Sequence, residues 1–155
     1  MKLNAVIFCL ILLSCNQPTN NNLQTKIDSL QSVIDKSYKP GLGEFMSNIQ
    51  VHHAKLWFAG QNRNWELADF EINEIKEAMQ GIKDYCRDRP EVRSIGLIEP
   101  AIDSVSTSIG KEDRVLFKNA FIQLTNSCNN CHKQTAHGFN VIQIPNTPPF
   151  SNQKF

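Results

Sequence analysis

Apolar side chains recur along most of this chain at alternating intervals of three and four residues, the spacing of one face of an α-helix. The stretches with this pattern cover residues 42–59, 64–87, 95–109 and 111–138. Asn64 is a good N-cap for the second stretch, whereas Pro100 indicates a late start or a kink in the third. Gly138 is expected to end the fourth. We therefore predict four consecutive helices.

The connections between these helices are short, so that helices adjacent in sequence should pack as antiparallel neighbours. The predicted fold class is all-α, an up-down-up-down four-helix bundle over residues 42–138. The fourth helix should present one buried stripe to its core, formed by Phe117, Phe121, Leu124, Cys128 and Cys131.

The segments on either side of the bundle have different patterns. Residues 15–24 are almost entirely polar and are predicted to form a flexible tether. Residues 25–39 are predicted to form a short amphipathic helix, because four aliphatic residues share one face. The tail, 139–155, is rich in proline and contains a single short apolar run, FNVIQI, as a weak strand candidate.

The N-terminus has the pattern of an export signal. Lys2 provides a positive start, and an apolar run too short to span a bilayer follows it. Residues 1–14 then end in Leu-Leu-Ser before Cys15, which resembles the lipobox of bacterial lipoproteins. This resemblance implies that Cys15 is lipidated and that the protein is anchored to a membrane, facing the periplasm. Because Asn16 follows rather than a retention-type Asp, we favour the outer membrane.

Composition and charge reduce the number of function classes that fit the chain. The chain has 155 residues, enough for one domain with its own core. Removal of the signal would leave 15 basic and 15 acidic side chains without a basic cluster, so that nucleic acid is a poor partner. No base, nucleophile or oxyanion-type arrangement stands out, and we therefore do not predict an enzyme.

The strongest chemical signal is Cys128-Asn129-Asn130-Cys131-His132, a Cys-x-x-Cys-His motif. Each thiol can form a thioether with one haem vinyl group, and the histidine that follows can bind the iron as proximal ligand. The motif lies at the end of the apolar stripe of the fourth helix. A covalently bound haem c would therefore be directed into the bundle core.

The motif has three other interpretations. A zinc site could combine Cys128, Cys131 and His132 with His137 or His53, but structural zinc usually organises a smaller fold. A thioredoxin-like redox pair requires a helix N-terminus, whereas this motif lies near a C-terminus. A disulfide would close too small a loop to stabilise the fold much. Cys86 is left as a buried free thiol.

A four-helix bundle with one CxxCH near the end of its last helix resembles the class II cytochromes c, that is, cytochrome c prime and its low-spin relatives. The resemblance covers about residues 42–138, and the stretch HHAKLWFAGQNRNWELADFEINEI also resembles small haem-c proteins of this type. The anchor, the helix at 25–39 and the tail depart from the family pattern. The tail could cover an exposed haem edge or form an ordered surface arm.

The resemblance implies that the first helix supplies the distal iron ligand. Met46 is the candidate there, and His53, two turns further along the same face, is the alternative. Met46 is favoured because the end of an antiparallel fourth helix should lie beside the start of the first. A plain core role for Met46 stays open. His52 is expected to face solvent, and Trp57 and Trp65 to pack in the core or at its rim.

The functional hypotheses differ in whether the haem iron has this distal side chain as its sixth ligand. His/Met ligation raises the reduction potential and suits an electron carrier that serves partners of a respiratory chain. An open iron site would instead bind NO or CO, as in cytochrome c prime. A zinc-binding structural lipoprotein without haem is a second alternative. The resemblance also implies a homodimer formed through the first two helices.

Overall fold

The computed structural model describes residues 21–155. The expected signal, Cys15 and most of the tether lie outside these residues. The described part is all-α, and it contains no strand, so the run 139–144 is irregular rather than extended in a sheet. Its elements in chain order are α2 (Asn21–Lys36), α3 (Leu42–Gln61), α4 (Trp65–Tyr85), the 3-10 helix η2 (Pro90–Ile98), α5 (Glu99–Gly110) and α6 (Arg114–Gln134).

Helix α2 belongs to a unit distinct from the one formed by residues 39–155. It begins at Asn21, four residues before the predicted start, so that the end of the expected tether is helical. None of its residues is buried. Within residues 21–155, no helix is both long enough and apolar enough to cross a membrane.

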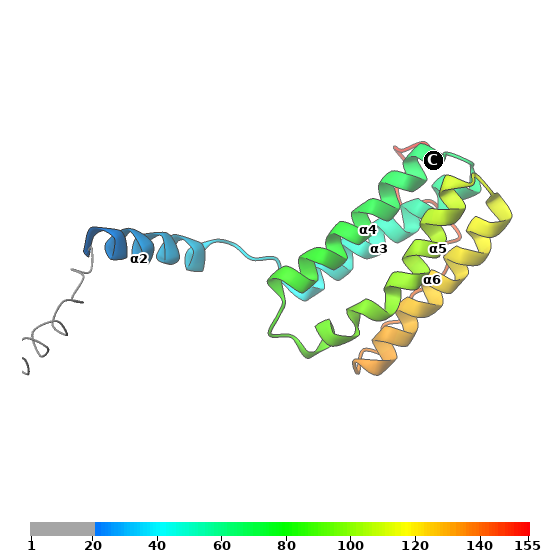
Figure 1. Cartoon of the computed structure of the whole chain (residues 1–155). Coiled ribbons are helices and arrows are strands. Elements are labelled where there is room, and N and C mark those ends of the chain that lie inside the picture. The colour runs from blue at the N-terminus through cyan, green and yellow to red at the C-terminus, as the bar shows by residue number, and fades with distance from the viewer. Residues whose placement is uncertain (1–20) are drawn as a thin grey trace, which may run out of the picture. The chain divides into compact units, whose positions relative to one another are not determined.

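The second unit is built from α3, α4, α5 and α6, which pack around one apolar core. Figure 1 shows α3 beside α4 and α5 beside α6. Further contacts join α4 to α5 and α3 to α6. The largest fully buried side chains include Phe117 and Phe121 of α6 and Leu56 of α3. Trp57 and Trp65 pack at the rim, where each contacts the ring of Phe117.

The helix boundaries partly match the predicted ones. Asn64 caps α4 as expected, since its side chain accepts a hydrogen bond from Leu67 N. The third helix was expected from about Ile95 with a late start or a kink at Pro100, and the late start is confirmed. Residues up to Ile98 form η2, and α5 begins at Glu99 with Pro100 in its first turn, where a missing N–H costs nothing. Leu97, an apolar residue of the third predicted stretch, lies in η2 and is 56% exposed.

The predicted limits of the fourth helix were wrong. Helix α6 begins at Arg114 rather than Lys111, because the Asp113 carboxylate caps the backbone N–H groups of Val115 and Leu116. It ends at Gln134, four residues before Gly138. The turn is made by Ala136, which adopts a positive φ of 61° without being glycine. The chain therefore reverses earlier than the sequence indicated.

One buried charge cluster joins α3 to α4. Glu71 is completely buried, and one of its oxygens lies 2.5 Å from His52 Nδ1 while the other lies 2.8 Å from Lys55 Nζ. The prediction that His52 faces solvent was therefore wrong, because the ring turns toward the acidic residue on the neighbouring helix. A buried carboxylate without these partners would be strongly destabilising, so the cluster ties the register of α3 to that of α4.

A close approach of α3 to α6 depends on Gly60. A Cβ atom at this position would lie 2.2 Å from two ring atoms of the fully buried Phe117. We expect Gly60→Ala to lower the free energy of unfolding by about 1–3 kcal/mol through overpacking, despite the better helix propensity of alanine. Urea unfolding would measure the change. Gly110→Ala is the matched control, since its Cβ would meet no atom within 4 Å. Equal stability of the two variants would contradict this packing.

Candidate functional site

The buried stripe of α6 leads directly to the Cys-x-x-Cys-His motif. Phe117, Phe121 and Leu124 are buried in the core as predicted, and Cys128, one turn further, is partly buried against it. Because the same helix face continues, Cys131 also points inward at the end of the helix. The packing of α6 thus directs both cysteines toward the space between the helices.

That space is a cavity of about 340 Å³, here called the main cavity. Its walls come from the start of α3, from η2, from the end of α6 and from the residues after it. The volume is within the range of about 300–1,000 Å³ that is typical of small-molecule and cofactor sites. Among the lining side chains are all five predicted haem-site residues: Met46, His53, Cys128, Cys131 and His132.

The two motif cysteines are free thiols in a poorly solvated environment. Burial raises the pKa of the Cys128 thiol to about 12 and also raises that of Cys131. Cys131 Sγ lies 3.9 Å from the carbonyl oxygen of Ser94 in η2. A thiol held protonated is a weak nucleophile, so these properties do not favour the thiol-redox interpretation. Cys86 is buried with a free thiol, as predicted.

His53 is committed to a partner on α6. Its Nε2 lies 2.9 Å from Thr125 Oγ1, and the Thr125 hydroxyl already donates its proton to the carbonyl of Phe121. The histidine must therefore donate from Nε2. Its ring also packs against Phe121, with 4.5 Å between centroids. Burial lowers the pKa of His53 to about 4, so the ring is neutral near pH 7.

Met46 has no such competing partner in the structure. Its side chain is partly buried and packs against the apolar core while lining the main cavity. Met79, a buried residue of α4, lines the same cavity. A thioether is a soft ligand that suits haem iron. Two methionines thus face the space into which the motif points.

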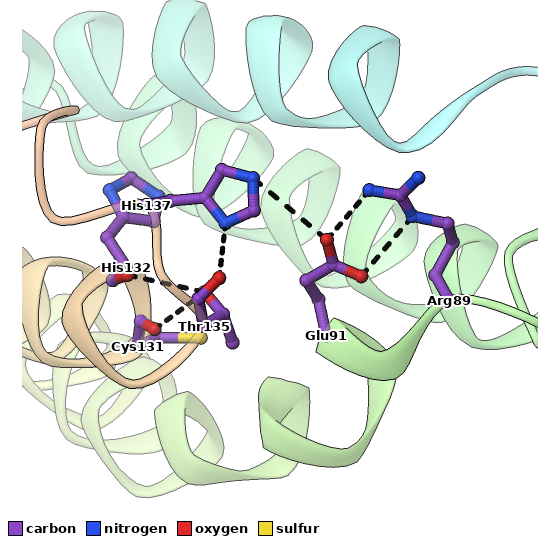
Figure 2. A network of polar contacts seen from close by, with 6 residues as sticks. All are labelled: Arg89, Glu91, Cys131, His132, Thr135 and His137. Atoms are coloured by element: carbon purple, nitrogen blue, oxygen red, sulfur yellow. Dashed lines mark hydrogen bonds and ion pairs between the residues drawn. The ribbon is translucent and has the colours of Figure 1, made fainter.

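The rim of the main cavity is charged, which the sequence did not predict. Figure 2 shows Glu91 between Arg89 and His137. Arg89 donates two hydrogen bonds to the Glu91 carboxylate, and His137 Nε2 lies 4.0 Å from the same group. The hydrogen bond of its own backbone, followed by that of the Arg89 side chain, lowers the pKa of Glu91, which is therefore ionised at neutral pH.

His132, the predicted proximal ligand, lies at the end of α6 and contacts the tail. Its Nδ1 is 2.7 Å from the carbonyl oxygen of Asn140. The chain reverses at Ala136, and this turn places His137 N 2.7 Å from the His132 carbonyl oxygen. The tail residues that follow can therefore reach His132. Residues 140 and 142 of the tail line the main cavity, and the ring of Phe155 packs at a tilt against that of Phe58 of α3. The tail therefore runs back along the helices.

The residues proposed for zinc do not form a metal-binding group in the described part of the chain. No three His, Cys, Asp or Glu side chains among residues 21–155 lie close enough together to hold a metal ion. Cys128, Cys131 and His132 line one cavity. His53 is turned toward Thr125 and His137 toward Glu91. The geometry thus gives the zinc interpretation no support.

Comparison with known proteins yields no family for this chain. No protein-family model matches it, and no similar curated protein or solved structure was found. The resemblance to the class II cytochromes c therefore stays a hypothesis, based on the motif, the helix order and the cavity.

Some site residues could not have been found from sequence. Arg89 and Glu91 follow the second helix in a polar turn, and nothing in their pattern indicates a cavity. Met79 carries the ordinary spacing of a core residue. Asn140 contacts His132 through its backbone carbonyl, and the type of a side chain does not indicate such a contact. A tail that departs from the family pattern was the only hint that residues beyond the motif take part.

The state of His53 predicts how stability depends on pH. Its pKa is about 4 in the folded chain and about 6.5 when unperturbed, so the unfolded chain binds more protons between these values. The free energy of unfolding of the haem-free chain should therefore fall, by up to about 3 kcal/mol from this group, as pH drops from about 6.5 to about 4.

Urea unfolding across this pH range would measure the effect. His53→Gln keeps an N–H donor for Thr125 but cannot take up a proton, so that its stability should fall less steeply than that of the unchanged chain. Identical pH profiles would mean that His53 is not the buried neutral group described above.

Proposed function

We propose that this protein is an exported c-type cytochrome with one covalent haem, which transfers single electrons. The observation that carries the proposal is that both thiols of a Cys-x-x-Cys-His motif line one cavity together with its histidine and two methionines. Such a constellation has the ligand types of a haem c, in a cavity whose volume is within the general range of cofactor sites. Independent support comes from the packing, since the stripe that holds α6 in the core also directs the cysteines inward.

The residues of the main cavity fit the parts of a haem. Cys128 and Cys131 would form the thioethers, and His132 would bind the iron on one side. Ile49, Ile95 and Ile98 provide apolar walls for the ring. Arg89, which is half-exposed at the rim, would pair with a propionate. The bound haem supplies a one-electron ferric/ferrous couple.

Met46 is the distal ligand that we propose. His53 is the weaker candidate, because its Nε2 is held by Thr125 and the hydrogen bond would have to break before that nitrogen could bind iron. A packed helical scaffold keeps the ligand positions fixed when the electron arrives or leaves. An iron without a sixth ligand would instead leave the site open for NO or CO, and this gas-binding function is the alternative.

The surrounding architecture is part of the same proposal. We infer an up-down-up-down bundle of α3, α4, α5 and α6, supported by the contacts between successive helices and by the short turns before α4 and α6. A lipid on Cys15 would hold the bundle at the periplasmic side of a bacterial membrane. There it would meet respiratory redox partners, and a homodimer is consistent with the class II resemblance.

Absorption spectra test the function and the distal ligand together. The protein, produced with haem-attachment machinery, would be recorded as ferric, ferrous and ferrous with CO. We expect a low-spin ferrous spectrum that CO does not change, because Met46 fills the sixth position. Met46→Leu, which conserves volume, should give a high-spin spectrum that shifts with CO.

Met79→Leu is the matched control, since it alters the other methionine of the cavity and should leave the spectrum unchanged. Conversion by Met79→Leu instead would overturn the assignment of Met46. If the unchanged protein is high-spin and binds CO, the electron-carrier function is wrong and the gas-binding alternative holds.

A further inference from the structure

Asn129, one of the two unassigned residues inside the Cys-x-x-Cys-His motif, is bonded to the tail. Its side-chain amide donates to the carbonyl of Ile142 at 2.9 Å, and its side-chain oxygen accepts from the N–H of Ile142 at 2.8 Å. A single asparagine thus pairs with both backbone groups of one tail residue. Its neighbour in the motif, Asn130, is exposed. The two asparagines therefore differ in role despite their identical chemistry.

The paired residue lies two positions after the carbonyl that His132 contacts. His132 Nδ1 is 2.7 Å from the carbonyl oxygen of Asn140, and a carbonyl can only accept a hydrogen bond. Nδ1 must therefore carry a proton. In a neutral imidazole the lone pair is then on Nε2, which is the nitrogen left to bind a metal.

A histidine that binds a metal usually donates its other N–H to a carbonyl or carboxylate, which fixes the tautomer and orients the ring. We propose that Asn129 is a positioning residue: by holding Ile142, it keeps the Asn140 carbonyl against His132 and so sets the tautomer and donor strength of this histidine. This inference rests on the proposed function. It gives the tail a task at the site, beyond covering an edge or forming a surface arm.

The clamp makes a prediction for the chain without haem. In the unchanged full-length chain, the Ile142 amide should exchange slowly with solvent, and NMR of the imidazole nitrogens at pH 8 should find the proton of His132 on Nδ1. Asn129→Ala should speed exchange of the Ile142 amide at least tenfold and mix the tautomers of His132. Asn130→Ala should behave like the unchanged chain.

Asn140→Ala is a second control, because the bond to His132 uses the backbone carbonyl, which alanine keeps. Asn140→Ala should therefore behave like the unchanged chain. If substitutions acted only by a general loosening of the tail, Asn140→Ala would have the same effect as Asn129→Ala. If Ile142 exchanges equally fast with and without Asn129, or if His132 carries its proton on Nε2 in the unchanged chain, the proposal is overturned.

The haem-loaded protein provides the second readout. Loss of the hydrogen bond to Asn140 should weaken electron donation from His132 and disfavour ferric iron, so that Asn129→Ala should shift the reduction potential to more positive values. Asn130→Ala should leave it unchanged. A potential that is equal in all variants would overturn the proposed effect on donor strength. Absence of covalent haem from the unchanged protein would contradict the proposed function alone, because exchange and tautomer are measured without haem.

Discussion

The apolar stripe of α6 is the constraint on which the rest of the structure depends. Phe117 and Phe121 are completely buried, and their rings contact each other and Trp57. Burying side chains of this size stabilises a small domain by several kcal/mol and fixes the rotation of the helix about its own axis. The rotation is what matters chemically, because Cys128 and Cys131 continue the same face. Any other rotation would direct the motif into solvent.

The opposite wall of the cavity is set by α3, whose position is fixed from two sides. Gly60 of α3 permits the close contact with Phe117 of α6. On the other side, the buried Glu71 of α4 pairs with His52 and Lys55 of α3. Core packing is non-directional, whereas a buried carboxylate with two partners tolerates little sliding. Helix α3 therefore holds Met46 and His53 at fixed positions along the helix axis, opposite the cysteines.

The periodic parts of the fold could be predicted from the sequence, whereas the irregular parts could not. The stripe of α6 predicted the burial of Phe117, Phe121 and Leu124 correctly, because a 3.6-residue period is decided locally, whereas Cys128 and Cys131 at its end are only partly buried. The boundary between η2 and α5 and the end of α6 depend on caps and turns whose partners are distant in sequence. The reversal at Ala136 is an example, since alanine gives no turn signal.

The candidate site follows the same division. Met46, His53 and the motif residues could be found from the motif and from helix spacing. The hydrogen bond of His53 to Thr125 and the charged rim at Glu91 arise only from tertiary packing. The same is true of the backbone contact between Asn140 and His132, which no side-chain pattern encodes.

The most direct test of the central claim is a peptide map of the protein produced with haem-attachment machinery. Trypsin cleaves after Lys118 and Lys133, so that both motif cysteines fall in the single peptide 119–133. This peptide should carry the mass of one haem, retain the haem absorbance under denaturing conditions and contain no free thiol. An unmodified peptide 119–133, or haem that separates from the chain on denaturation, would contradict the account.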